Sequence, residues 1–186
     1  MTPRPGRKPA ATPAAIPGVE ALRLPRGGPT PNSDLPLVIR RAALEPDPDA
    51  PAATFEAAFR ANGWTAGWRN GIFPYEHFHS TAHEVLGIAA GSALVRFGGE
   101  GGREVPLATG DVIVIPAGVG HKLVEEDANL LVVGAYAEGR SWDIVRPAPA
   151  KLGAALARIA AVPLPQSDPV DGPDGPLMAL WGAAPA

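Results

Sequence analysis

Several side chains of the types that bind metal ions lie near one another in the middle of this sequence. All four histidines of the chain fall between positions 77 and 121. Three imidazoles and one carboxylate are donors that suit a borderline divalent ion such as Fe, Mn, Ni, Cu or Zn. The first two histidines are two residues apart, so on a strand both would point to the same side. The sequence therefore predicts one divalent ion held by His77, His79, Glu84 and His121.

The composition excludes several classes of function. The chain has no cysteine, which rules out disulfides, thiolate metal sites and cysteine nucleophiles. Its net charge is −3 and its Arg and Lys residues are scattered, so a nucleic-acid footprint is not expected. The longest apolar run, residues 130–137, is too short to span a bilayer, and no secretory signal is recognised. We expect a cytoplasmic protein whose partner is a small molecule, with neither nucleic acid nor membrane.

The chain divides into three parts by composition. Residues 1–33 are rich in Pro, Ala and Gly, and we expect an N-terminal extension that is extended or disordered. Residues 34–146 are expected to form one β domain with a covering helix, since 186 residues suffice for one real core. Residues 147–186 are expected to hold a short helix and then a Pro- and Gly-rich tail that wraps the surface.

From Trp64 onward the pattern is typical of β structure. The 23 prolines and 22 glycines exclude a mostly helical fold. One helix is predicted at 52–62, where Phe55, Ala58 and Phe59 share a face that could cover a sheet. Short apolar segments separated by turns indicate an all-β sandwich or barrel. The predicted strands are 37–40, 72–79, 84–90, 93–97, 104–108, 112–116, 121–124 and 130–136.

Two motifs resemble those of the cupin superfamily. The first, residues 71–91, reads G-x5-H-x-H-x4-E-x6-G and matches the family at every fixed position. The second, residues 110–125, reads G-x5-P-x-G-x2-H-x3 and ends in Glu125 where the family has Asn. That Asn is not a metal ligand in the family, so the departure leaves the metal site intact. The wider context of residues 68–71 and 79–84 resembles a bacterial group of small cupins called YjlB-like.

The resemblance implies a fold and an assembly. Cupins are double-stranded β-helices, small jelly rolls closed into a barrel. The barrel would occupy residues 34–146, with the four metal donors facing its interior. Cupins commonly pair through their sheets, so we expect a homodimer, in which Leu37–Arg40 could be a swapped or added strand.

The residues that would bind a substrate are less well marked. The candidates are Arg69, Tyr75 and Tyr136. Arg69 could bind a carboxylate or phosphate group of the substrate. The alternative is that these residues have ordinary roles at a strand edge or in the core. His83 adjoins Glu84 and faces the other way on a regular strand. It is therefore expected behind the ligands, at the surface or at an interface rather than on the metal.

Three functions are compatible with such a site. The preferred one is a mononuclear metal-dependent enzyme, a dioxygenase-like oxidoreductase that acts on a small oxygen-bearing substrate. The alternatives are a non-catalytic module that binds a small ligand and a non-redox isomerase or epimerase of sugar type. Glu76 or Glu125 could carry protons, but the sequence places neither, and this barrel hosts many chemistries.

Overall fold

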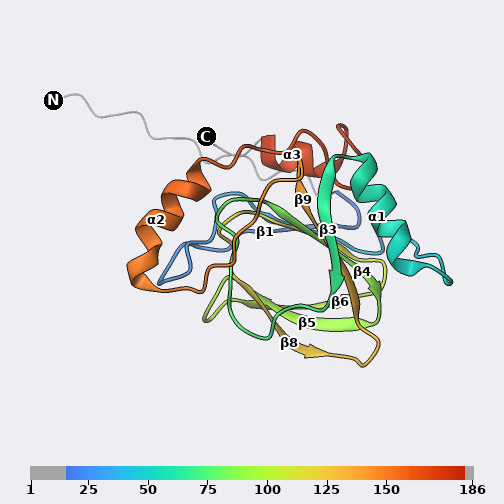
Figure 1. The fold of residues 1–186 in the computed structure, drawn as a ribbon, viewed down its shortest axis with the longest axis horizontal. Helices are drawn as coiled ribbons and strands as arrows, with labels where there is room; N and C mark the ends of the chain where they lie inside the picture. The colour runs from blue at the N-terminus through green and yellow to red at the C-terminus, as the bar shows by residue number, and fades with distance from the viewer. Residues whose placement is uncertain (1–15, 183–186) are drawn as a thin grey trace.

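The computed structural model describes residues 16–182, which form two antiparallel β-sheets and three short helices (Figure 1). The elements in chain order are β1 (Val19–Leu22), β2 (Leu37–Arg40), α1 (Pro51–Ala61), β3 (Trp64–Asn70), β4 (Glu84–Ala90), β5 (Ser92–Phe97), β6 (Arg103–Ala108), β7 (Val112–Ile115), β8 (His121–Glu126), β9 (Leu131–Ala137), α2 (Pro149–Ala160) and α3 (Pro176–Gly182). The larger sheet has the order β1-β2-β7-β4-β9-β3, and the smaller has the order β6-β5-β8. This arrangement confirms the predicted all-β jelly roll.

The larger sheet is covered on both faces. On β4, Leu86 and Ile88 face the interior between the two sheets, where they pack with side chains of β5 and β6. Val85, on the opposite face, packs in an outer cluster with Phe55 of α1 and Trp181 of α3. A strand buried on both faces needs apolar residues at successive positions, whereas β5 alternates between buried and more exposed residues.

Two glycines let bulky rings approach this sheet. A Cβ atom on Gly87 would clash with the ring of Phe55, which lies on the outer face of β4. A Cβ atom on Gly134 of β9 would clash with the indole of Trp68, which lies on the inner side. Glycine in a strand often marks such a close approach. The two positions set how near α1 and Trp68 come to the sheet.

The segment before the first histidines differs from the prediction. Residues 72–79, predicted as a strand, form a loop in which only His77 and Phe78 make isolated bridges. Pro74 lies within this range and cannot donate a hydrogen bond to a strand ladder. The strand in this region is instead β3, which was not among the predicted ranges. Most other predicted strands differ from the observed ones by one or two residues.

The N-terminal segment is part of the sheet. The N-terminal residues were expected to be extended or disordered. Residues 19–22 are extended and pair with β2, so they are not disordered. Strand β2 lies between β1 and β7 of its own chain, so Leu37–Arg40 has no free edge to lend to a second copy. Residues 1–15 of the predicted extension lie outside the described part of the chain. A homodimer stays a prediction.

The C-terminal segment, expected to wrap the surface, also contributes side chains to the core. Leu177, Leu180 and Trp181 of α3 are buried in the outer cluster. Asp168 is fully buried and accepts backbone hydrogen bonds that shape the turn before α3. The short helix expected in residues 147–186 is α2. Within residues 16–182, no helix has the length and apolar character needed to cross a membrane.

We predict opposite effects of one substitution at two glycines. Gly87→Ala should destabilise the protein by about 1–3 kcal/mol, because the added methyl group must displace the buried Phe55 ring. Gly153→Ala, on the exposed side of α2 with nothing near the added methyl, should stabilise by about 0.5–1 kcal/mol. Urea unfolding measures both changes. Equal effects of the two substitutions would contradict the packing described for α1.

Candidate metal centre

The four predicted metal donors come from both sheets and from a loop that joins two strands of the larger sheet. Glu84 is the first residue of β4 in the larger sheet, and His121 is the first residue of β8 in the smaller sheet. His77 and His79 lie on the loop between β3 and β4. Two backbone hydrogen bonds, of 3.2 and 2.9 Å, tie His77 to His121, and Gly118 N–H donates to the carbonyl oxygen of His79 at 2.8 Å. The loop is thereby fastened to the turn that precedes β8.

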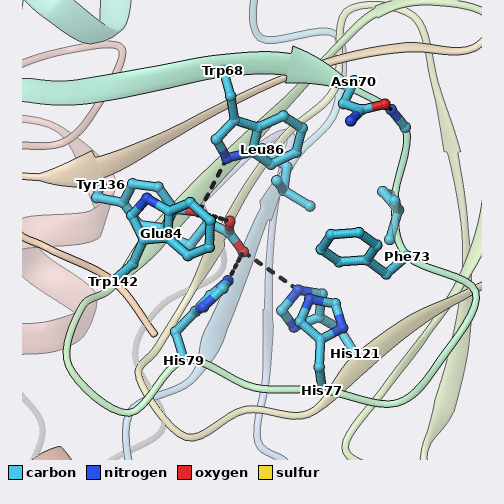
Figure 2. Close-up of a pocket in the computed structure, with 12 residues that line it drawn as sticks. Trp68, Asn70, Phe73, His77, His79, Glu84, Leu86, His121, Tyr136 and Trp142 are labelled. Carbon is cyan, nitrogen blue, oxygen red and sulfur yellow. Dashed lines mark hydrogen bonds and ion pairs between the residues drawn. The ribbon is translucent and has the colours of Figure 1, made fainter. Parts of the chain in front are cut away.

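The donor atoms converge on one point (Figure 2). His77, His79 and His121 each offer a ring nitrogen, and these nitrogens lie within 4.8 Å of one another. Glu84 Oε2 lies 3.2 Å from His79 Nε2 and 3.4 Å from His121 Nε2. Adjacent ligands on an ion with bonds of about 2.1 Å are about 3 Å apart, so the two distances from Glu84 Oε2 suit one shared ion. Among the described residues, Glu84 Oε2 is buried and has no hydrogen-bond partner besides these two imidazole contacts.

Backbone carbonyl groups fix the tautomer of all three histidines. Nδ1 of His77 lies 3.1 Å from the carbonyl oxygen of Tyr75, and Nδ1 of His121 lies 3.2 Å from that of Val119. Nδ1 of His79 contacts the carbonyl oxygen of Asp143. A carbonyl oxygen only accepts, so each Nδ1 must carry a hydrogen and donate it. The Nε2 lone pairs are thus left for an ion, the usual arrangement behind metal-bound histidines.

Burial and close contact set the charges of the donors. Burial and the neighbouring His121 ring lower the pKa of His77 to about 3, so this imidazole is neutral near pH 7. Burial raises the pKa of Glu84, but the imidazoles of His79 and His121 outweigh it and hold that pKa below its ordinary value. Burial likewise opposes a charged His79, yet the Glu84 carboxylate raises its pKa overall. The buried carboxylate thus calls for a positive charge beside it, which a metal ion would supply.

Two aromatic side chains hold the glutamate from behind. Tyr136 donates its hydroxyl hydrogen to Glu84 Oε1 at 2.9 Å, and Trp68 Nε1–H donates to the Tyr136 oxygen at 3.0 Å. Burial and the nearby Glu84 charge raise the pKa of Tyr136, so it stays protonated. With Oε1 engaged in this way, Oε2 is the oxygen that faces the histidines.

A polar network holds His79 from its other side. The Asp143 carboxylate accepts hydrogen bonds from Ser80 N–H at 2.6 Å and from the Ser80 hydroxyl at 2.5 Å. Arg158 of α2 donates to Ser80 Oγ at 2.7 Å. This network fixes the backbone of Asp143, whose carbonyl oxygen meets His79. Sequence reasoning missed Asp143, because it lies outside both motifs and its role depends on a contact across 64 residues.

The donors lie at one end of a small pocket. Its volume is about 190 Å³. Apart from the four donors, Asn70 and Gly71, its walls are apolar or aromatic side chains: Trp68, Ile72, Phe73, Leu86, Tyr136 and Trp142. Phe73 and Trp142 are each 40% exposed and stand at the opening. The pocket can therefore take a small molecule whose body is largely apolar.

Of the candidate substrate-binding residues, the structure places only Tyr136 in this pocket. Arg69 forms a two-pronged ion pair with Glu56 of α1 and does not line the pocket. Tyr75 stacks on Phe73 and lies under Arg146, in a separate groove. Two tryptophans, Trp68 and Trp142, also line the pocket.

His83 lies behind the predicted metal donors, apart from their cluster. It is buried, and its ring packs 4.7 Å from that of Trp181. Its Nδ1 accepts a hydrogen bond from Ala117 N–H at 3.0 Å, so its hydrogen is on Nε2. Ala117 belongs to the turn before His121, and His83 therefore supports that turn.

Comparisons with known proteins are consistent with this architecture. A family model described as a cupin domain matches residues 69–134. The uncharacterized protein YjlB of Bacillus subtilis is 39% identical over 158 residues, which are 84% of this chain and 93% of that protein. An acireductone dioxygenase structure from Bacillus anthracis, with cadmium in its active centre, has a TM-score of 0.41 and 19% identity over 54% of this chain and 77% of that one. A Bacillus subtilis oxalate decarboxylase variant has a TM-score of 0.37 and 18% identity over 64% and 30%. At these scores the structures carry no argument about activity.

The buried His83 leads to a prediction about pH. Burial lowers its pKa from 6.5 to about 4, so between these values the unfolded chain binds a proton that the folded protein does not. The contribution of His83 to stability is therefore complete above pH 6.5 and falls by about 3 kcal/mol as the pH approaches 4. His83→Asn keeps an acceptor for Ala117 N–H but does not titrate. Urea unfolding from pH 7 to 4 should show a shallower loss of stability in this variant, and identical slopes would contradict the assignment.

Proposed function

The chain belongs to the YjlB-like cupins, and on the geometry of its site we propose that it is a mononuclear metal-dependent enzyme of dioxygenase-like, oxidoreductase class. Its substrate is a small oxygen-bearing molecule. One divalent ion is held by His77, His79, Glu84 and His121. The observation that carries the proposal is the orientation of the three imidazoles, whose Nδ1 atoms all face backbone carbonyl groups.

The protein and the ion divide the chemistry between them. A bound divalent ion would polarise a substrate oxygen, and a redox-active ion such as Fe would also allow oxidation by O₂. Tyr136 and Trp68 hold Glu84 in place, and the Asp143 carbonyl group does the same for His79. The apolar walls exclude water from the body of the substrate.

The pocket favours redox chemistry over isomerisation. An isomerase or epimerase needs a side chain that accepts a proton from carbon and returns it. Among the residues that line the pocket, the four donors and Tyr136 are the titratable ones. The Tyr136 hydroxyl donates its hydrogen to Glu84, and its raised pKa keeps it protonated, so it is not available to accept a proton. Glu76, a candidate proton carrier, lines the separate groove, and Glu125 is exposed on β8.

Metal analysis tests the proposal most simply. Protein purified without a metal-affinity tag should contain close to one equivalent of a divalent transition metal. His77→Ala should lose most of it, whereas His83→Asn should keep it, because residue 83 lies outside the cluster and Asn keeps an acceptor for Ala117 N–H. Circular dichroism checks that both variants are folded.

Several results would count against the proposal. Metal content in the wild type no higher than in His77→Ala, even after reconstitution with each ion, would remove the metal centre. Stoichiometric metal without O₂ consumption on any small diol, diketone or hydroxy acid would favour the non-catalytic binding module instead. Equal metal loss in His83→Asn would mean that the variants act through folding.

A second prediction concerns the support of Glu84. Tyr136→Phe removes the hydroxyl that donates to Glu84 Oε1 and accepts from Trp68. Removing such an outer partner commonly costs about 10–100-fold in metal affinity, so we expect a loss in this range with the fold intact. Competition with a metal-binding dye measures the affinity, and Trp142→Phe, which alters the same wall without touching Glu84, is the matched control. Equal losses in both variants would assign the effect to packing.

A further inference from the structure

We propose, on the basis of the metal centre proposed above, that the pocket selects a substrate with a ring-sized apolar body and at most one negative charge. Dicarboxylates and polyhydroxylated substrates such as sugars are excluded by the same walls. The inference rests on the volume, the lining and the charge of the pocket.

The volume limits the size of the substrate body. An engineered apolar cavity of about 150 Å³ holds one benzene molecule. The pocket here measures about 190 Å³, and its exposed lining residues are Asn70, Phe73 and Trp142. One six-membered ring and a short oxygen-bearing group therefore fill it. A second ring would have to lie outside, against the two exposed aromatic side chains.

The polar groups of the walls are already engaged with one another. Trp68 Nε1–H is used by Tyr136, and the Tyr136 hydroxyl is used by Glu84. Asn70 Oδ1 accepts from Gly71 N–H, so its Nδ2 is the amide atom left to donate. Figure 2 shows Asn70 at the end of the pocket away from the histidines. A polyol placed here would lose the water around several hydroxyl groups and find few side-chain partners in return.

The charge of the site admits one anionic group. A divalent ion with the Glu84 carboxylate and three neutral imidazoles would carry a net charge of about +1. A substrate with one negative charge neutralises it. A dianion would leave an uncompensated negative charge, because neither Lys nor Arg is among the described residues that line the pocket. Arg69, the candidate for reading an anion, is held by Glu56 instead.

The rim adds to this preference. Phe73 lies edge-on to the His77 ring, with ring centres 5.3 Å apart, and Trp142 lies edge-on to the His79 ring at 5.6 Å. Each stands directly beside a metal donor while part of its surface faces water. An apolar substrate body bound at the metal would cover the exposed surfaces of both Phe73 and Trp142. This cover would shield the reacting atoms as well as bind the substrate.

Three hydroxy acids with one shared chelating group test the inference. Mandelate, malate and gluconate all present a 2-hydroxycarboxylate, but their bodies are a phenyl ring, a second carboxylate and a polyol. Their binding to the cobalt(II)-loaded protein under nitrogen is measured by calorimetry, with the visible cobalt bands as a second readout. We expect mandelate to bind at least about tenfold more tightly than malate or gluconate.

Two variants distinguish the effect of a charge at the pocket rim from the effect of the same charge elsewhere on the surface. Phe73→Arg places a cation at the rim and should reduce the preference for mandelate over malate by about tenfold or more. Leu164→Arg adds the same charge at another exposed apolar residue, which does not line the pocket, and should leave the preference unchanged. A change of equal size in both variants would overturn the role of the rim.

Azide distinguishes failure of this inference from failure of the metal centre. If azide shifts the cobalt bands but malate or gluconate binds as tightly as mandelate, the substrate class is wrong and the metal centre stands. If the protein binds no cobalt, or if azide leaves the cobalt bands unchanged, an open metal site is absent. Both proposals would then be wrong.

Discussion

The geometry of this site depends on hydrogen bonds between imidazole Nδ1–H groups and backbone carbonyl oxygens. A buried imidazole has one nitrogen that donates and one that accepts, and the donor must find a partner. Here the partners of His77, His79 and His121 are main-chain carbonyl groups, which cannot rotate away as a side chain can. The remaining nitrogens are thereby aimed at one point beside the Glu84 carboxylate. If these carbonyl groups moved, the donors would no longer converge.

The rest of the fold keeps those carbonyl groups in place. The backbone hydrogen bonds between His77 and His121 join the loop before β4 to the first residue of β8 in the smaller sheet. His83 and Trp181 support the turn that carries the Val119 carbonyl group, so α3 contributes to the site although it lies on the outer side of the larger sheet. Helix α2 acts in the same way, because Arg158 reaches Ser80 and with it the Asp143 network. Elements outside the barrel thus determine the position of atoms inside it.

The sequence predicted the part of the site that short-range patterns encode. The spacing of His77, His79 and Glu84, together with the later His121, indicated a metal centre, and the turn-punctuated apolar segments indicated the β fold. Contacts between residues far apart in the chain could not be predicted from the sequence. Asp143 meets His79 across 64 residues, and nothing around Arg69 in the sequence shows that Glu56 of α1 binds it. Composition misled at both ends of the chain, where Pro- and Gly-rich segments nevertheless contribute β1 and α3.

The central claim is that backbone contacts preset the tautomers of the metal donors, and nitrogen-15 NMR of the imidazole rings measures it directly. In the zinc-loaded protein, the rings of His77, His79 and His121 should carry hydrogen on Nδ1, with the Nε2 signals shifted by the metal. His83 should show the opposite tautomer, with hydrogen on Nε2 and no response to zinc. Hydrogen on Nε2 of any of the three donors, or four rings unchanged by zinc, would contradict the account.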